Sequence, residues 1–93
     1  MPGLLSIQLQ NLDNYFMERS RWTYAINRYT ARSGCEKPIR EALAAFYSPF
    51  KENENLFLEG LRSEFRPILD KQISAVCLYL GIEREILEGE YLL

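Results

Sequence analysis

The fold is decided by the stretch LLSIQLQNLDNYFMERSRWTYAINRYTAR, residues 4 to 32, which contains neither proline nor glycine. Its apolar residues recur seven apart in columns that lie side by side on a helix, and together these columns form a face about 140° wide. The pattern predicts one helix from Leu4 to Arg32, closed by Gly34 in the left-handed conformation. The columns are Leu5, Leu12 and Ile26; Leu9 and Phe16; and Tyr15, Trp22 and Tyr29.

The predicted helix is long for so small a protein. At about 1.5 Å per residue it measures about 43 Å, whereas a compact chain of this size has a diameter of about 30 Å. The chain is also 47% hydrophobic and 13% aromatic, although a domain this small buries only about two-thirds of its unfolded surface. We therefore expect part of the helix, or part of its aromatic face, to extend past the domain and to serve as an interface.

Two prolines divide the middle of the chain. Pro38 suits the first position of a second helix of about ten residues. That helix must end before Pro49, because the residue ahead of a proline avoids the helical region. Ser48 has the side chain of a helix N-cap, so we expect a third helix to begin there with Pro49 in its first turn.

The last third of the chain is marked by another proline and another glycine. Pro67 removes a backbone hydrogen bond and predicts a kink or a break, after which the apolar pattern continues to Gly81, a second helix terminator. Residues 83 to 91 predict a short final helix with Ile86 and Leu87 facing inward. The expected fold is all-α, a small bundle of four or five helices in a single domain spanning residues 1 to 93.

Charge is nearly balanced overall but not along the chain. The net charge is −2, which predicts no general attraction to nucleic acid or to a membrane. Residues 1 to 47 carry six basic and four acidic side chains, giving +2, and residues 48 to 93 carry five basic and nine acidic, giving −4. The two halves can attract each other, either within one chain or between antiparallel subunits.

The start of the chain lacks the pattern of a signal peptide, since residues 1 to 12 have neither a charged start nor an apolar run of about seven residues. No stretch approaches the roughly 18 apolar residues of a membrane span. We therefore expect a cytoplasmic protein with no membrane association.

Metal binding is not expected. The chain contains no histidine and two cysteines, Cys35 and Cys77, which lie far apart, so the pairs of ligands typical of zinc sites are missing. Cys77, between Val76 and Leu78, is predicted to be a buried apolar residue. Cys35 falls in a predicted turn, where we expect an exposed thiol.

Catalysis is not expected either. Without histidine the chain lacks the commonest general base near neutral pH, and no glycine-rich turn is present to hold phosphate. The carboxylates of the third helix have a spacing typical of a solvated face, and no spacing brings two of them together onto an apolar surface. The sequence predicts a non-enzyme without a cofactor; the carboxylates in question are Glu52, Glu54, Glu59 and Glu64.

The most suggestive pattern lies on the long helix, where three arginines project within about 40° of one another beside the aromatic column. Three interpretations fit this pattern. The aromatic side chains can be core and the arginines a solvated edge, the two can form a protein-binding hot spot, or they can hold a single nucleic-acid strand by stacking. The residues are Arg21, Arg28 and Arg32, beside Tyr15, Trp22 and Tyr29.

Arg19 is a charge within the apolar face, in the column of Leu5, Leu12 and Ile26. Its burial without a partner would be costly. We expect either an acidic partner from the second half of the chain, in the order Glu59, Glu64 and Asp70, or a face that stays exposed until another protein binds.

These observations predict a non-catalytic protein–protein interaction module: an adaptor, a small regulator or an assembly subunit. We expect a homodimer through the long helix, with Tyr15, Trp22 or Ile26 buried between chains, and a protein partner with an acidic and apolar surface. The alternative is a nucleic-acid-binding regulator that uses the arginines and aromatic residues of the same stripe. The predicted partner-binding residues are Arg19, Arg21, Trp22, Arg28, Tyr29 and Arg32.

Overall fold

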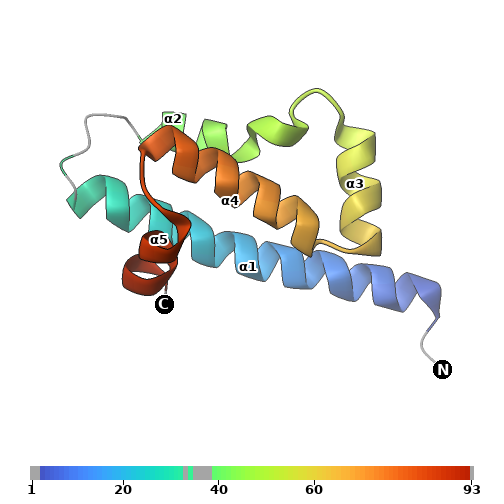
Figure 1. Ribbon diagram of the computed structural model, residues 1–93. Coiled ribbons are helices and arrows are strands. Elements are labelled where there is room, and N and C mark those ends of the chain that lie inside the picture. Colours follow the sequence, from blue (N-terminus) through green and yellow to red (C-terminus); the bar gives the residue numbers. More distant parts are fainter. Residues whose placement is uncertain (1–2, 33, 35–38, 93) are drawn as a thin grey trace.

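The computed structural model describes residues 3–32, 34 and 39–92, and in these ranges the protein is all-α (Figure 1). The predicted class is confirmed, as are the bounds of the long first helix. The elements are α1 (Leu4–Arg32), α2 (Ile39–Tyr47), the short 3-10 helix η1 (Ser48–Phe50), α3 (Glu54–Ser63), α4 (Arg66–Leu80) and α5 (Arg84–Tyr91).

Helix α1 runs along the whole molecule, and helices α2, α3, α4 and α5 pack on it (Figure 1). Helices α2 and α4 lie together over its middle and second half, α3 lies against its first half, and α5 contacts α1 near the second half. The molecule measures 50 × 29 × 18 Å with a radius of gyration of 14.2 Å, above the value of about 12 Å for a compact chain of this length. The beginning of α1 extends past α3, as its length predicts.

Pro67 produces a break and not a kink. Helix α3 ends at Ser63, Glu64 is extended (φ −156°, ψ 118°), and α4 starts at Arg66 with Pro67 in its first turn. A proline is tolerated in a first turn because the amide that it lacks would have no partner there. Starting a new helix therefore avoids the cost of a proline inside a longer one.

The predicted start of the third helix at Ser48 is wrong. Ser48 opens η1, and its hydroxyl donates to the carbonyl of Ala45 (2.9 Å). The cap of α3 is Asn53, whose Oδ1 accepts from the amide of Leu56 (3.0 Å). Asparagine is as good an N-cap as serine. The Ser48 hydroxyl is directed to the carbonyl of the preceding turn and does not accept from an amide of a following helix. The predicted helix start at Pro38 lies outside the described residues.

Both terminating glycines adopt the left-handed conformation, Gly34 with φ 63° and Gly81 with φ 71°. At the end of α4 the amides of Gly81 and Ile82 both donate to the carbonyl of Cys77, at 2.9 and 3.1 Å. These bonds satisfy a carbonyl that the helix end would otherwise leave open. The chain turns sharply there and returns as α5 to pack against α1.

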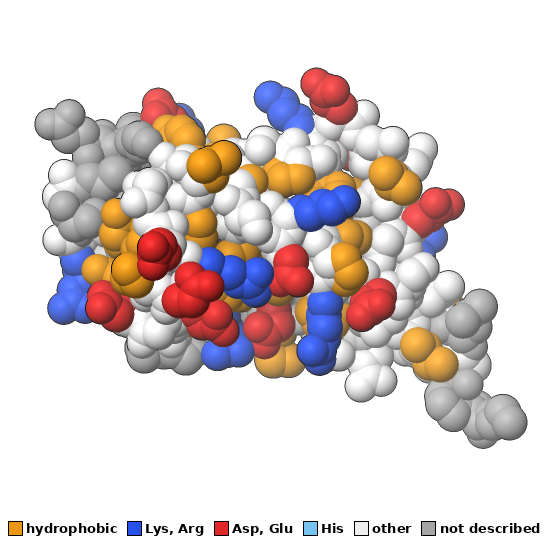
Figure 2. Space-filling model, in the orientation of Figure 1, with side chains coloured by type: hydrophobic (Ala, Val, Ile, Leu, Met, Phe, Trp, Pro, Cys, Tyr) orange, Lys and Arg blue, Asp and Glu red, His pale blue; other side chains and the backbone are white. Residues whose placement is uncertain are grey.

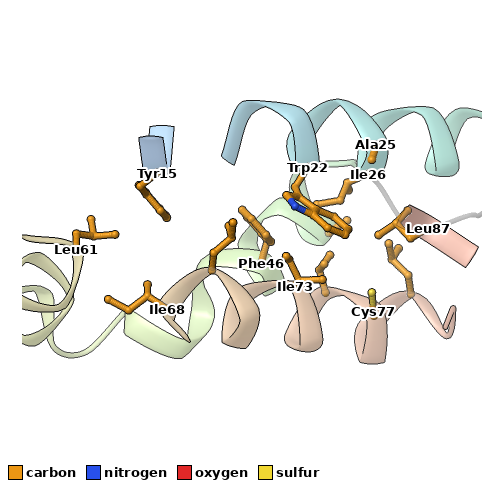
Figure 3. Packing of buried hydrophobic residues seen from close by; sticks show 14 residues of the cluster. Tyr15, Trp22, Ala25, Ile26, Phe46, Leu61, Ile68, Ile73, Cys77 and Leu87 are labelled. Atoms are coloured by element: carbon orange, nitrogen blue, oxygen red, sulfur yellow. The ribbon is translucent and has the colours of Figure 1, made fainter. Parts of the chain in front are cut away.

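The hydrophobic core lies between α1, from Tyr15 to Ile26, and the helices that cover it (Figure 3). Cys77 is buried as predicted, and burial raises the pKa of its thiol. In α5 the expectation holds for Leu87, which is fully buried, but not for Ile86, which is exposed. The most deeply buried apolar side chains are Tyr15, Ala25, Ile26, Ala42, Phe46, Leu61, Ile73, Val76 and Leu87.

Candidate interaction surfaces

The aromatic column of the predicted stripe belongs to the core. Tyr15 and Ile26 are 0% exposed and Trp22 is 3% exposed, and residues of the same chain cover all three. The expectation that one of them is buried between two chains is therefore wrong. The physical reason is that they lie at the centre of the apolar face of α1, where α2, α3 and α4 pack.

Helix α5 covers the side of α1 on which the arginines project. The guanidinium of Arg84 lies over the Trp22 ring, 5.7 Å from its centroid. The Tyr29 ring meets the Tyr91 ring edge to face, with centroids 5.5 Å apart. Neither Tyr15 nor Trp22 can stack on a nucleic-acid base without displacing its own neighbours, so the stacking platform of the alternative function is occupied.

The arginines of the stripe are engaged with the end of the chain or with neighbouring acids. Arg28 donates through Nη1 to the backbone carbonyl of Tyr91 (2.5 Å), and the Arg32 guanidinium lies 6.0 Å from the centroid of the Tyr91 ring. Arg21 pairs with Glu18 (2.9 Å). These contacts fit the interpretation of the arginines as an edge that covers the core.

Arg21 opens onto a groove between α1, α4 and α5 with a volume of 520 Å³. Basic and acidic side chains are intermixed around it, as they are over the face shown in Figure 2. An even mixture of signs offers no net attraction to phosphate. The charged residues of this groove are Arg21, Arg66, Arg84, Glu18, Asp70 and Glu88.

Arg19 has a different partner from the one predicted. Its Nε donates to the hydroxyl of Tyr47 (2.9 Å), and its guanidinium lies 4.9 Å from the Tyr47 ring centroid and 5.5 Å from that of Phe16. Asp70 instead pairs with Arg84 (2.8 Å). The predicted pairing with Glu59, Glu64 or Asp70 is therefore wrong, because aromatic faces and a phenol oxygen hold the half-buried cation.

An apolar stripe on the first half of α1 is left uncovered. Leu5 is 68% exposed, Leu9 53% and Phe16 49%, while Leu12 between them is half-buried. These four residues, which we call the Leu5–Phe16 stripe, are spaced four, three and four apart. That spacing keeps them on one line along a helix and is the spacing of a coiled-coil seam.

The part of α1 that carries this stripe has very few charged side chains. Asp13 is the one charged residue between Leu4 and Met17, although a solvated helix face normally carries several charges. The stripe continues into a shallow groove of 460 Å³ formed by Phe16, Arg19 and Tyr24 of α1 with Tyr47 of α2. Contiguous exposed apolar surface of this kind marks interaction sites.

The apolar spacing of this stripe is visible in the sequence, but its exposure to solvent could not be predicted from it. The predicted apolar face of the helix includes Leu5, Leu9 and Phe16 together with Tyr15 and Trp22. That face is wider than the helices packed on α1, so its far edge remains open beside the first half of the helix. The near absence of charge between Leu4 and Met17 is the property that could have separated the stripe from an ordinary solvated edge.

Two searches of the described residues bear on other functions. No helix among them is both long and apolar enough to cross a membrane. No group of three or more cysteine, aspartate and glutamate side chains within the described ranges has the arrangement to hold a metal ion.

The fold and its surfaces thus define a small all-α bundle with an uncovered apolar stripe on its longest helix. Comparison of the chain with known protein families, with characterised proteins and with solved structures finds no match.

Proposed function

We propose that this chain is a non-catalytic protein–protein interaction module, acting in the cytoplasm as an adaptor, small regulator or assembly subunit, and that it forms a homodimer through α1. The observation that supports the proposal is the Leu5–Phe16 stripe, three of whose four side chains are about half exposed or more. Burying exposed apolar area is the main favourable term in protein association, at about 25 cal/mol per Å².

A second copy of the same chain is the occupant that best fits the stripe. Residues spaced alternately four and three apart pack into the matching spaces of an identical helix. In a twofold-symmetric dimer the same patch serves both subunits, so no other surface has to be complementary. The beginning of α1, at one end of the stripe, also extends past α3, and a second helix can lie alongside it there (Figure 1).

This proposal moves the contact surface from the residues predicted by the sequence. The expected contacts through Trp22 and Tyr29 are replaced by Leu5, Leu9 and Phe16. Arg19 remains at the edge of the surface, next to Phe16. A protein with acidic and apolar groups is the second candidate for this surface, because such a partner would also meet the Arg19 cation.

The test is the molar mass in solution, measured by sedimentation equilibrium at about 100 µM, where a dissociation constant in the micromolar range gives mostly dimer. We expect the wild type to be dimeric and Leu9→Glu to be monomeric, because the change puts a charge into the seam. Ile7→Glu is the matched control: Ile7 is 48% exposed but lies about 160° around the helix from Leu9. A monomeric wild type, or equal dissociation of both variants, contradicts the homodimer.

A further inference from the structure

A second apolar depression lies on the other side of Tyr47, between α2, η1, α3 and α4. This α2–α4 groove has a volume of 840 Å³. Its walls include Ala44 and Ala45 of α2 together with Phe50 and Phe57, whose rings are stacked with centroids 5.2 Å apart. Small-molecule sites are concave, mostly apolar and about 300–1,000 Å³ in volume, and the groove meets each of these criteria.

One buried polar side chain lines the groove, and it has an unused donor. Gln72 is 1% exposed, and its Oε1 accepts from the hydroxyl of Tyr15 (2.9 Å). Among the described residues its Nε2 donates to no protein group, and this atom is not completely buried. Since Oε1 is bonded to Tyr15, the two Nε2 hydrogens are the part of the amide left for an acceptor inside the groove.

The rim of the groove bears more negative than positive charge. Glu41 accepts from the hydroxyl of Tyr79 (2.9 Å) at one side, and Glu54 and Lys51 lie at another. Two carboxylates against one ammonium disfavour an anionic ligand. The part of α4 that lines the groove runs from Gln72 to Tyr79, about 10 Å of helix, which is short for a docked peptide helix and suited to a small molecule.

We propose that the α2–α4 groove is a binding site for a small, uncharged aromatic molecule that carries a carbonyl oxygen. Its ring packs on Phe50, Phe57 and the two alanines, and its carbonyl accepts a hydrogen bond from Nε2 of Gln72. The site uses none of the Leu5–Phe16 stripe and so is independent of the proposed dimer.

The probe for this site is N-acetyl-L-tryptophan amide, which is uncharged, aromatic and rich in carbonyl oxygens. Titrated into ¹⁵N-labelled protein, it should produce saturable NMR shifts at the side-chain amide of Gln72 and at the backbone amides of Ala44 and Ala45. N-acetyl-L-tryptophan, of nearly the same shape but anionic, should bind at least threefold more weakly. Absence of saturable shifts up to about 10 mM probe, or equal binding of the acid, overturns the proposal.

Two substitutions locate the binding. Ala44→Trp, at an exposed position in the groove wall, should abolish the saturable shifts by filling the groove, whereas Ala31→Trp, equally exposed near the end of α1, should not. Gln72→Glu keeps an acceptor for Tyr15 but removes the donor, and should weaken binding of the amide about fivefold. Unchanged binding by folded Ala44→Trp overturns the proposal even if Gln72→Glu fails to fold. Leu9→Glu should bind the probe like wild type, which separates this site from the dimer.

Discussion

The two halves of α1 follow the same apolar pattern and have opposite surroundings. From Trp22 onward the apolar side is enclosed by α2, α4 and α5, whereas Leu5, Leu9 and Phe16 in the first half face outward. The molecule is 50 Å long, and the helices that pack on α1 do not cover its apolar face over this whole length. A periodic pattern shows which side of a helix is apolar, but what covers that side is determined by the lengths and positions of other elements.

The largest expected effect comes from one substitution made in each half. Ile26 is 0% exposed and Leu9 is 53% exposed, so Ile26→Ala removes fully packed methyl groups while Leu9→Ala removes partly solvated ones. We expect the free energy of unfolding to fall by about 2–5 kcal/mol for Ile26→Ala and to change by no more than about 0.5 kcal/mol for Leu9→Ala.

The measurement is urea denaturation at about 0.1 µM protein, where a dimer with a dissociation constant of about 1 µM is largely dissociated. Equal losses in the two variants would mean that the first half of α1 is covered within the monomer, and the comparison of the two halves would fail.

The fold class and the bounds of α1 could be predicted because they depend on local chemistry. No proline or glycine interrupts the chain from Leu4 to Arg32, and Gly34 ends the helix. Pro67 fixed the division between α3 and α4 for the same reason. Such features act within a few residues of themselves and need no knowledge of the tertiary fold.

The candidate surfaces depend on contacts between distant segments and could be predicted only in part. The core position of Trp22 was one of three interpretations left open, and the choice required α5 to be placed over it. The partner of Arg19 is an aromatic residue 28 positions away, although opposite charge favoured an acid. Gln72 could not be predicted as a site residue, because a single glutamine belongs to no motif and its position is defined only by the contact with Tyr15.

A smaller effect is expected where the covered and uncovered halves meet, at Tyr15. Its hydroxyl donates to Gln72, and Tyr15→Phe leaves that buried acceptor without a partner, at a cost of about 1–3 kcal/mol. Urea denaturation at pH 7 measures the loss. If Tyr15→Phe loses no stability, water in the α2–α4 groove replaces the hydroxyl as the partner of Gln72. Gln72 would then be solvated and not part of the covered core.

The same hydroxyl predicts a pH dependence. Burial raises the pKa of the Tyr15 hydroxyl above its ordinary value of 10.0. A raised folded-state pKa means that the folded chain keeps a proton that the unfolded chain loses, so stability falls as pH rises above about 10. Wild type should lose stability there more steeply than Tyr15→Phe. Parallel curves would contradict the assignment.

The smallest effect concerns α3, which lies against the first half of α1 and so limits how much of it is exposed. Asn11 donates through Nδ2 to the carbonyls of Arg62 and Ser63 (2.9 and 3.1 Å) at the end of α3. Because water can replace exposed hydrogen bonds, Asn11→Ala should cost at most about 1 kcal/mol. Its local effect should be clearer: the amides of α3 should exchange hydrogen faster, while those of α4 around Ile73 stay protected.

Asn53→Ala tests the stability of α3 independently, because it removes the N-cap of this helix. The free energy of unfolding should fall by about 1 kcal/mol. If both substitutions speed exchange in α3 and neither changes the protection of α4, then α3 opens separately from the core and regulates the exposure of Leu12 beside it. If neither speeds exchange, the contacts of Phe57 and Leu61 with the core hold α3 without help from its ends. The first half of α1 would then present a fixed surface, a property that favours a rigid dimer seam over one that forms only on binding.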